Sequence, residues 1–120
     1  MIERLESLVN DKIENFTNAC KEMQSVIETY IKQMCMTLDC EEIELTSKNV
    51  FPIRMYNSYT DEYEYGKVER VRYTNNQVEI GLSDEWDNYE VWHNINDMLI
   101  EYLPMLFHSV QKECEVININ

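Results

Sequence analysis

The pair Asn75-Asn76 is the sequence feature that most restricts the fold, because two runs of alternating apolar and polar residues flank it across residues 67–82. Asparagine is among the few residues that tolerate a positive φ, which both central residues of a two-residue type I′ turn require. This stretch therefore predicts a β-hairpin with a two-residue turn.

Counting outward from that turn sets the register of the hairpin. Apolar residues then meet on one face and opposite charges meet on the other, as in a correctly paired antiparallel ladder. Val68 falls out of phase with the apolar residues that follow it, which predicts a β-bulge near Glu69-Arg70. The expected pairs are Tyr73 with Val78, Val71 with Ile80, and Arg72 with Glu79.

The net charge of −13 over 120 residues restricts the partners of this chain, whose length suits a single domain. Nucleic acids and anionic membranes repel such a charge, whereas basic protein surfaces attract it. Residues 41–120 carry sixteen acidic and six basic residues, so most of the excess lies beyond the first predicted helix. We expect no direct nucleic-acid binding and no membrane binding, and the expected partner is a basic protein.

The N-terminal stretch is charged and amphipathic, and no apolar run approaches the ~20 residues of a membrane span. The expected location is the cytoplasm, where Cys20, Cys35, Cys40 and Cys114 are reduced thiols. The composition, rich in Asn and Ile and poor in Ala, is also typical of AT-rich genomes such as those of phages and mobile elements.

Apolar residues recur every three or four positions through residues 2–37, which predicts one long N-terminal helix within residues 1–38. From Ile13 onward the spacing alternates between three and four, the heptad rhythm of a helix seam. An unbroken helix of this length would exceed ~50 Å. Either it breaks near Asn10-Asp11, or it projects and pairs with a second copy. The seam of such a homodimer would contain Phe16, Cys20, Met23, Ile27 and Tyr30, which in a simpler interpretation pack in the core of one chain.

Short alternating runs between residues 43 and 92 predict a β-meander of four or five antiparallel strands. One run contains Pro52, which cannot donate to a ladder and so indicates an edge strand. An apolar stripe through residues 94–114 predicts a C-terminal helix that starts at a cap on Asn94 or Asn96. The stripe continues across Pro104, which favours a kink there over two separate helices, and the sequence leaves open whether Pro104 kinks a helix or begins one. The expected fold is a single α+β domain, residues 1–120, in which both helices cover one face of the sheet.

Residues suited to catalysis or metal binding are sparse. His93 and His108 are far apart, and neither is spaced with a cysteine or carboxylate as a metal pair would be. Cys35 and Cys40 lack the second close pair of a zinc site, and the acidic run 84–87 lacks the glycine and distal glutamate of a calcium loop. The sequence therefore predicts no catalytic residue, no metal and no cofactor.

Acidic and aromatic residues are interleaved in two segments, residues 59–65 and 84–92. Carboxylates attract a basic partner over a long range, and Tyr and Trp supply the rigid anchors that dominate interface energetics. The leading hypothesis is a non-catalytic inhibitor or decoy that occupies the basic surface of a nucleic-acid-handling protein by mimicking nucleic acid. Its expected partner-binding residues are Tyr59, Asp61, Glu62, Tyr63, Glu64, Tyr65, Asp84, Glu85, Trp86, Asp87, Tyr89 and Glu90.

Other interpretations of the same residues stay open. Aromatic residues at strand ends often close a core, and acid-rich loops are usually only solvated. A first alternative function is a homo-oligomeric structural or adaptor protein assembled through the N-terminal helix, with the acidity serving solubility. A second is a small-ligand or enzyme module around Trp86, Trp92 and His93. The sequence also leaves open whether the two acid-aromatic segments lie at the same end of the sheet.

Overall fold

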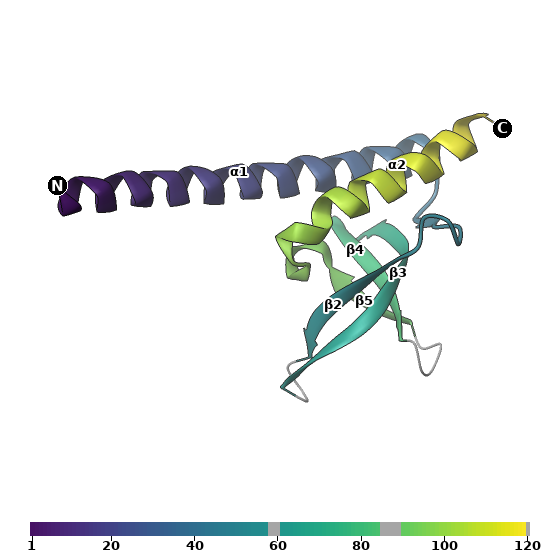
Figure 1. Ribbon diagram of the computed structural model, residues 1–120. Helices are drawn as coiled ribbons and strands as arrows, with labels where there is room; N and C mark the ends of the chain where they lie inside the picture. The colour runs from purple at the N-terminus through teal and green to yellow at the C-terminus, as the bar shows by residue number, and fades with distance from the viewer. Residues whose placement is uncertain (58–60, 85–89, 120) are drawn as a thin grey trace.

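The computed structural model describes residues 1–57, 61–84 and 90–119 (Figure 1). Helix α1 (Ile2–Thr37) is continuous, and its N-terminal half extends well past the rest of the molecule. The principal extents of 60 × 36 × 28 Å reflect this projection. The break considered near Asn10-Asp11 does not occur, because residues 2–37 contain neither Gly nor Pro to interrupt the ladder of backbone hydrogen bonds.

The C-terminal end of α1 is set by a left-handed residue. Asp39 adopts φ 52°, and the Cys40 N–H donates to the Cys35 carbonyl at 3.0 Å while the Asp39 N–H donates to the Met36 carbonyl at 3.2 Å. This is the pattern of a Schellman motif, which satisfies the last free carbonyls of a helix. The chain is thereby turned off the helix axis and into the sheet.

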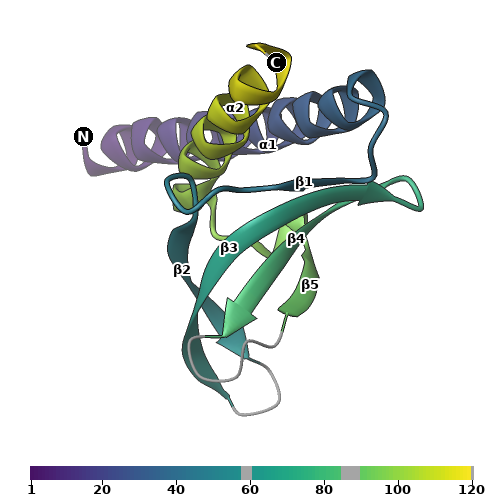
Figure 2. The same ribbon diagram turned by 90° about the vertical axis from the view of Figure 1, so that its right-hand side faces the viewer.

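In the described part of the chain, five strands form one antiparallel sheet (Figure 2). The long strand β3 pairs along one edge with β1 near its end and with β2 near its start, and along the other edge with β4, which pairs with β5. Pro52 lies in β2, an edge strand as predicted. The strands are β1 (Glu42–Glu44), β2 (Phe51–Asn57), β3 (Glu62–Thr74), β4 (Gln77–Asp84) and β5 (Glu90–Asn94).

The hairpin of β3 and β4 has the predicted turn and register. Asn75 and Asn76 have φ 52° and 63°, as a type I′ turn requires. The register shifts between Val68 and Arg70, so the predicted bulge is confirmed, and the carbonyl of the extra residue Glu69 accepts from the Leu45 N–H at 2.8 Å. The predicted pairs are confirmed: Tyr73 with Val78, Val71 with Ile80, and Arg72 with Glu79.

The C-terminal helix begins later than the apolar stripe indicates. Residues 95–97 and 100–102 form two 3₁₀ turns, η1 (Ile95–Asp97) and η2 (Ile100–Tyr102), and only then does α2 (Leu103–Ile119) start. The Asn94 side chain caps η1 by accepting from the Asn96 N–H at 2.9 Å. The favoured kink at Pro104 is wrong and the alternative holds, because Pro104 lies in the first turn of α2. A backbone N–H in the first turn has no partner within the helix, so proline is tolerated there.

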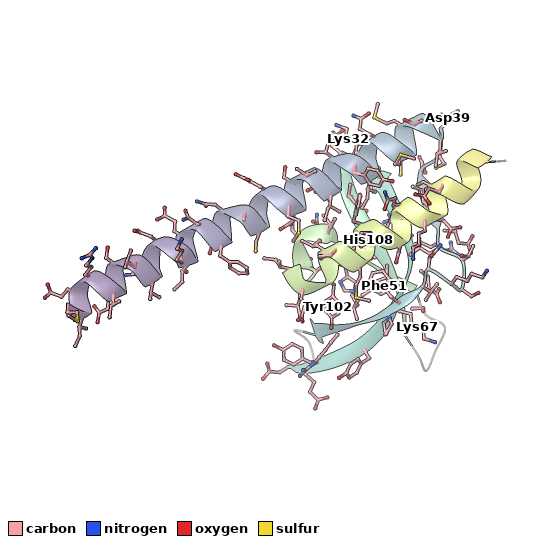
Figure 3. The ribbon with its side chains drawn as sticks, turned by 45° about the horizontal axis from the view of Figure 1, so that its top comes forward. Lys32, Asp39, Phe51, Lys67, Tyr102 and His108 are labelled. Atoms are coloured by element: carbon pink, nitrogen blue, oxygen red, sulfur yellow. The ribbon has the colours of Figure 1, made fainter. Side chains whose placement is uncertain are left out.

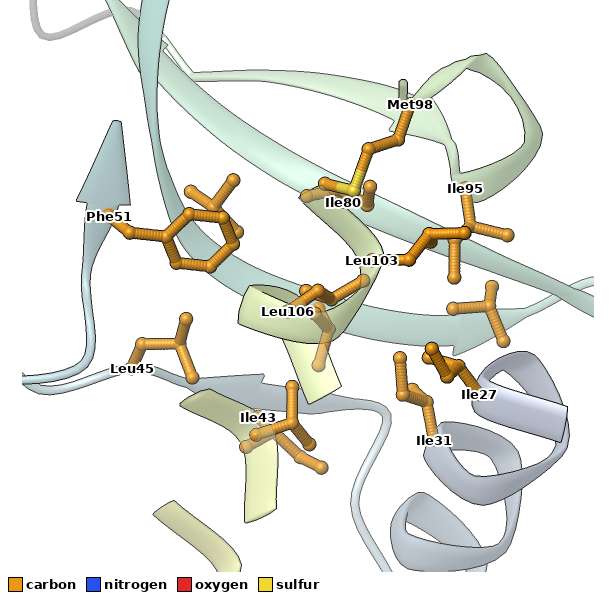
Figure 4. Close-up of a cluster of buried hydrophobic side chains, with 14 of the residues drawn as sticks. Ile27, Ile31, Ile43, Leu45, Phe51, Ile80, Ile95, Met98, Leu103 and Leu106 are labelled. Carbon is orange, nitrogen blue, oxygen red and sulfur yellow. The ribbon is translucent and has the colours of Figure 1, made fainter. Parts of the chain in front are cut away.

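Both helices cover the same face of the sheet and enclose one core (Figures 2 and 4). The α+β fold, with a long N-terminal helix, an antiparallel sheet and a C-terminal helix, is thus as predicted. The backbone N–H of Arg54 in β2 donates to the Tyr102 hydroxyl at 3.1 Å, which ties the edge of the sheet to η2. The central core residues are Ile31, Ile43, Ile53, Val68, Val71, Ile80, Ile95, Leu103, Leu106 and Val110.

Candidate interaction surfaces

The N-terminal half of α1, residues 2–19, is here called the arm. Every residue in it is exposed, and Figure 3 shows its side chains standing out from the helix with no other element of the described chain beside them. Its apolar residues nevertheless keep to one face. Leu5, Leu8, Val9, Ile13 and Phe16 line a shallow apolar surface there, with Phe16 70% exposed. A helix with such a stripe ordinarily faces another element of structure.

A second apolar surface, here called the groove, lies where α1 meets α2. It has a volume of about 610 Å³. Two of the residues that line it, Tyr30 and Phe107, contact each other edge to face, with ring centroids 5.0 Å apart. Burial raises the pKa of the Tyr30 hydroxyl above its usual value. The wall from α1 consists of Ala19, Glu22, Met23, Val26, Ile27 and Tyr30, and the wall from α2 of Pro104, Phe107 and His108.

The predicted dimer seam is divided between these surfaces and the core. Phe16 is exposed on the arm, Met23 and Tyr30 are half-buried in the groove, and Cys20 and Ile27 are each only 6% exposed within their own chain. Heptad spacing shows that one face of a helix is apolar, but not whether the same chain covers it. The sequence also missed the α2 wall of the groove. Phe107 falls within the apolar stripe through residues 94–114, and that stripe does not show that Phe107 and His108 line a groove.

The two acid-aromatic segments border the same end of the sheet. The first segment connects β2 to β3, where Asn57 pairs with Glu62, and the second connects β4 to β5. Asp84, at the end of β4, pairs with Gly66, so the two connections begin within a few residues of each other along β3. Residues Tyr59, Glu85, Trp86, Asp87 and Tyr89 lie outside the described residues, and Glu64, Asp84 and Glu90 are placed by their backbone in β3, β4 and β5.

The described side chains of the first segment are exposed. Tyr63 and Tyr65 are 53% and 63% exposed and, being two residues apart on β3, project from the same face of the strand. Asp61 and Glu62 are exposed beside them. The Arg54 guanidinium lies 4.1 Å from the centre of the Tyr63 ring, so a basic side chain already packs at this surface.

Trp92 and His93 are successive residues of β5 and therefore project from opposite faces of the sheet. The Trp92 ring stacks under the Arg72 guanidinium at 3.9 Å, and Arg72 is in turn bound to the Glu79 carboxylate at 3.1 Å. Trp92 thus has a packing partner within its own sheet. Trp86, the third residue of the predicted ligand module, lies outside the described residues.

The four cysteines are free thiols, and Cys20, Cys35 and Cys114 are buried. Burial raises the pKa of the Cys35 thiol and of the Cys114 thiol to about 11, so both are protonated near neutral pH and are poor nucleophiles. Among the described residues, no three His, Cys, Asp or Glu side chains come together in a way that would hold a metal ion.

No family model matches this sequence, and no curated protein or solved structure matches it either. In the part of the chain that the structure describes, no helix has both the length and the apolar character of a membrane span.

Proposed function

We propose that this protein is a non-catalytic adaptor that works as a homodimer, joined through α1. The observation that carries the proposal is the arm: residues 2–19 extend from the domain as a helix whose apolar face is left exposed by residues 1–57, 61–84 and 90–119. Most helical stability in proteins comes from packing an apolar face, and the arm has no such packing among the described residues of its own chain. A second copy offers the same apolar face and closes the assembly by twofold symmetry.

The free energy gained by burying the apolar side chains of the two arms supports a dimer that uses more than the arms. Five apolar side chains on the arm are roughly half exposed or more, which makes ten in a pair. Burying the exposed part of each is worth about 1 kcal/mol, or about 10 kcal/mol in all. Association itself costs ~4–15 kcal/mol. Pairing of the arms alone leaves little margin, so a stable dimer has to bury further apolar surface.

The proposal is tested by placing charge on the apolar face of the arm. Ile13→Glu with Phe16→Glu should abolish the dimer, because both residues lie on the apolar face of the arm and are more than half exposed in the single chain. The same exposure means that the domain should still fold. Ile27→Glu is unsuitable, because Ile27 is buried in the core and its loss would unfold the domain.

The matched control places the same two charges on the opposite face of the arm. Ser7→Glu with Asn18→Glu adds an equal charge to the same helix, about half a turn away from the apolar stripe. Light scattering coupled to gel filtration should give a monomer for the first pair and a dimer for the control. Equal masses for both pairs would refute an interface on the apolar face.

A second candidate function, binding of a basic protein surface by nucleic-acid mimicry, is favoured by the acid-aromatic end of the sheet. The exposure of Tyr63 and Tyr65 beside two acidic residues supports it, as does the placement of both hairpin ends together. The partner would be a basic nucleic-acid-binding protein met in the cytoplasm. The free thiols are in keeping with that reducing compartment.

This second function predicts a salt-dependent partner that nucleic acid displaces. Pull-down from a cell lysate at low and high salt, with and without competing DNA, would reveal it. Reversing the charges at Glu62, Glu64, Glu85 and Asp87 should weaken binding and flatten its salt dependence. Unchanged affinity in that variant would exclude the acidic residues as the binding surface.

A further inference from the structure

We infer that the groove between α1 and α2 is the receptor for the arm of a second copy, and that the two α1 helices run antiparallel. This inference rests on the proposed homodimer and names the site at which each arm is bound. Each subunit donates one arm and offers one groove, so the two contacts are equivalent and the pair is closed. No arm and no groove is then left exposed.

The two surfaces match in chemistry and in length. The groove begins at Ala19, the last residue of the arm, and its α1 wall continues through Tyr30. It therefore spans twelve residues of helix, or about 18 Å, and the apolar part of the arm from Leu5 to Phe16 has the same length. Both surfaces are lined mainly by aliphatic and aromatic side chains, so an arm from a second copy can fill the groove along its whole length.

The direction of the pair follows from charge. Extending the heptad rhythm back from Ile13 and Val9 places Glu6 at the edge of the apolar face of the arm. In a parallel pair in register, Glu6 would face the partner's Glu6, and like charges at such positions oppose pairing. The two helix dipoles would also lie side by side and point the same way, with like ends adjacent. An antiparallel pair avoids both repulsions.

The charge of the sheet domains points to the same direction. Residues 41–120 hold sixteen acidic and six basic residues, an excess of ten negative charges in each copy. A parallel pair would hold the two domains side by side. With the twofold axis near Asn18, an antiparallel pair separates them by about 30 Å along the helices. That separation exceeds the Debye length of ~8 Å at physiological salt several times over, so their repulsion is screened.

A twofold axis near Asn18 also gives a register that satisfies the heptad rhythm. Each heptad has two apolar seam positions, and in an antiparallel pair the first position on one helix faces the second position on the other. Val9 then lies level with Val26 and Ile27 of the partner subunit, and Ile13 lies level with the partner's Met23. Val26 is 66% exposed in the single chain, although it lines the groove. This register gives Val26 an apolar partner.

The register is tested by charge complementation between two variants that are each defective alone. Val9→Glu and Val26→Lys should each weaken the homodimer on the order of 100-fold, since each buries two unpaired charges. Both residues are more than half exposed, so both variants should fold, as far-ultraviolet circular dichroism would verify. Mixed together, they form a heterodimer in which the introduced glutamate of one copy meets the introduced lysine of the other and the second contact is wild type. Sedimentation velocity should then show affinity restored to within about tenfold of wild type.

The matched control mixes Val9→Glu with Val26→Glu, which brings two negative charges together and should stay monomeric. Failure of the Glu–Lys mixture to dimerise, while the wild type is a dimer, would overturn the antiparallel register and leave the proposed dimer standing. A wild type that is monomeric at every concentration would overturn the dimer and this inference together.

Discussion

Glu113 of α2 fastens the C-terminal helix to the turn that follows β1. It is only 5% exposed, and its carboxylate accepts from the Thr46 N–H at 3.0 Å and from the Asn49 side-chain amide at 2.7 Å. A buried carboxylate is tolerated when donors replace the water it has lost. Since α2 forms one wall of the groove, this single residue also holds that wall in place.

Removal of this carboxylate should destabilise the domain measurably. Glu113→Ala should lower the free energy of unfolding by about 2–3 kcal/mol, because two donors lose a charged acceptor. Glu113→Gln keeps an acceptor oxygen and should cost less. Urea denaturation measures both, and Glu115→Ala, at an exposed position of the same helix, should stay within about 0.5 kcal/mol of wild type. Equal losses for Glu113→Ala and Glu115→Ala would contradict this role.

Because two thiols are buried, the free energy of unfolding should change with pH in the alkaline range. The pKa of Cys35 and of Cys114 is raised from 9.0 to about 11, first of all by burial. The unfolded chain therefore releases these protons at lower pH than the folded chain does. The contribution of these two protonated thiols to the free energy of unfolding is fully present below pH 9 and is lost as the pH rises towards 11. Urea denaturation at about pH 8 and about pH 10 should show a smaller loss for Cys35→Ala than for wild type; parallel losses would contradict the assignment.

At the scale of elements, the β3–β4 hairpin is held by its turn. Asn76 adopts φ 63°, a conformation that β-branched residues strongly disfavour. Asn76→Val should lower the free energy of unfolding by about 1–2 kcal/mol relative to Asn76→Gly. Both variants lose the contact between the Tyr73 hydroxyl and the Asn76 side chain, so their difference isolates the backbone. Equal stabilities in thermal denaturation would show that the turn does not depend on this conformation.

The hairpin could be predicted from the sequence because its determinants are local. Two residues that tolerate positive φ and the alternation beside them define the turn, the register and the bulge without reference to the rest of the chain. The start of α2 could not be predicted in the same way. Ile95 and Met98 are both buried and three residues apart, a spacing that fits 3₁₀ turns as well as an α-helix. The apolar stripe therefore continued across Pro104 although the helix did not.

The surface residues show a second limit of prediction from sequence. Phe16 and Ile27 follow the same heptad rhythm, yet one lies on the exposed arm and the other in the core. The difference arises because α2 and the sheet reach only the C-terminal half of α1, which is a property of the assembled fold. The groove likewise requires residues from two helices about eighty positions apart, and no local pattern brings them together.

At the scale of the whole molecule, the projecting arm is the main departure from a compact domain. The radius of gyration of 17.0 Å exceeds the value of about 14 Å expected for a compact chain of this length. The acidic residues concentrate in the sheet domain, whereas the arm is nearly balanced in charge and apolar on one face. This division suits a molecule that presents an acidic domain at each end of a paired helical centre.

Sedimentation equilibrium of the wild-type protein over a wide range of concentrations would decide whether the arm joins two copies. The homodimer predicts a mass that rises with concentration to twice the 14.5 kDa of one chain and goes no higher. Ile13→Glu with Phe16→Glu should hold the mass at 14.5 kDa under the same conditions. The assembly proposed for α1 would be contradicted if the wild type kept the mass of one chain at every concentration and the control, Ser7→Glu with Asn18→Glu, behaved identically.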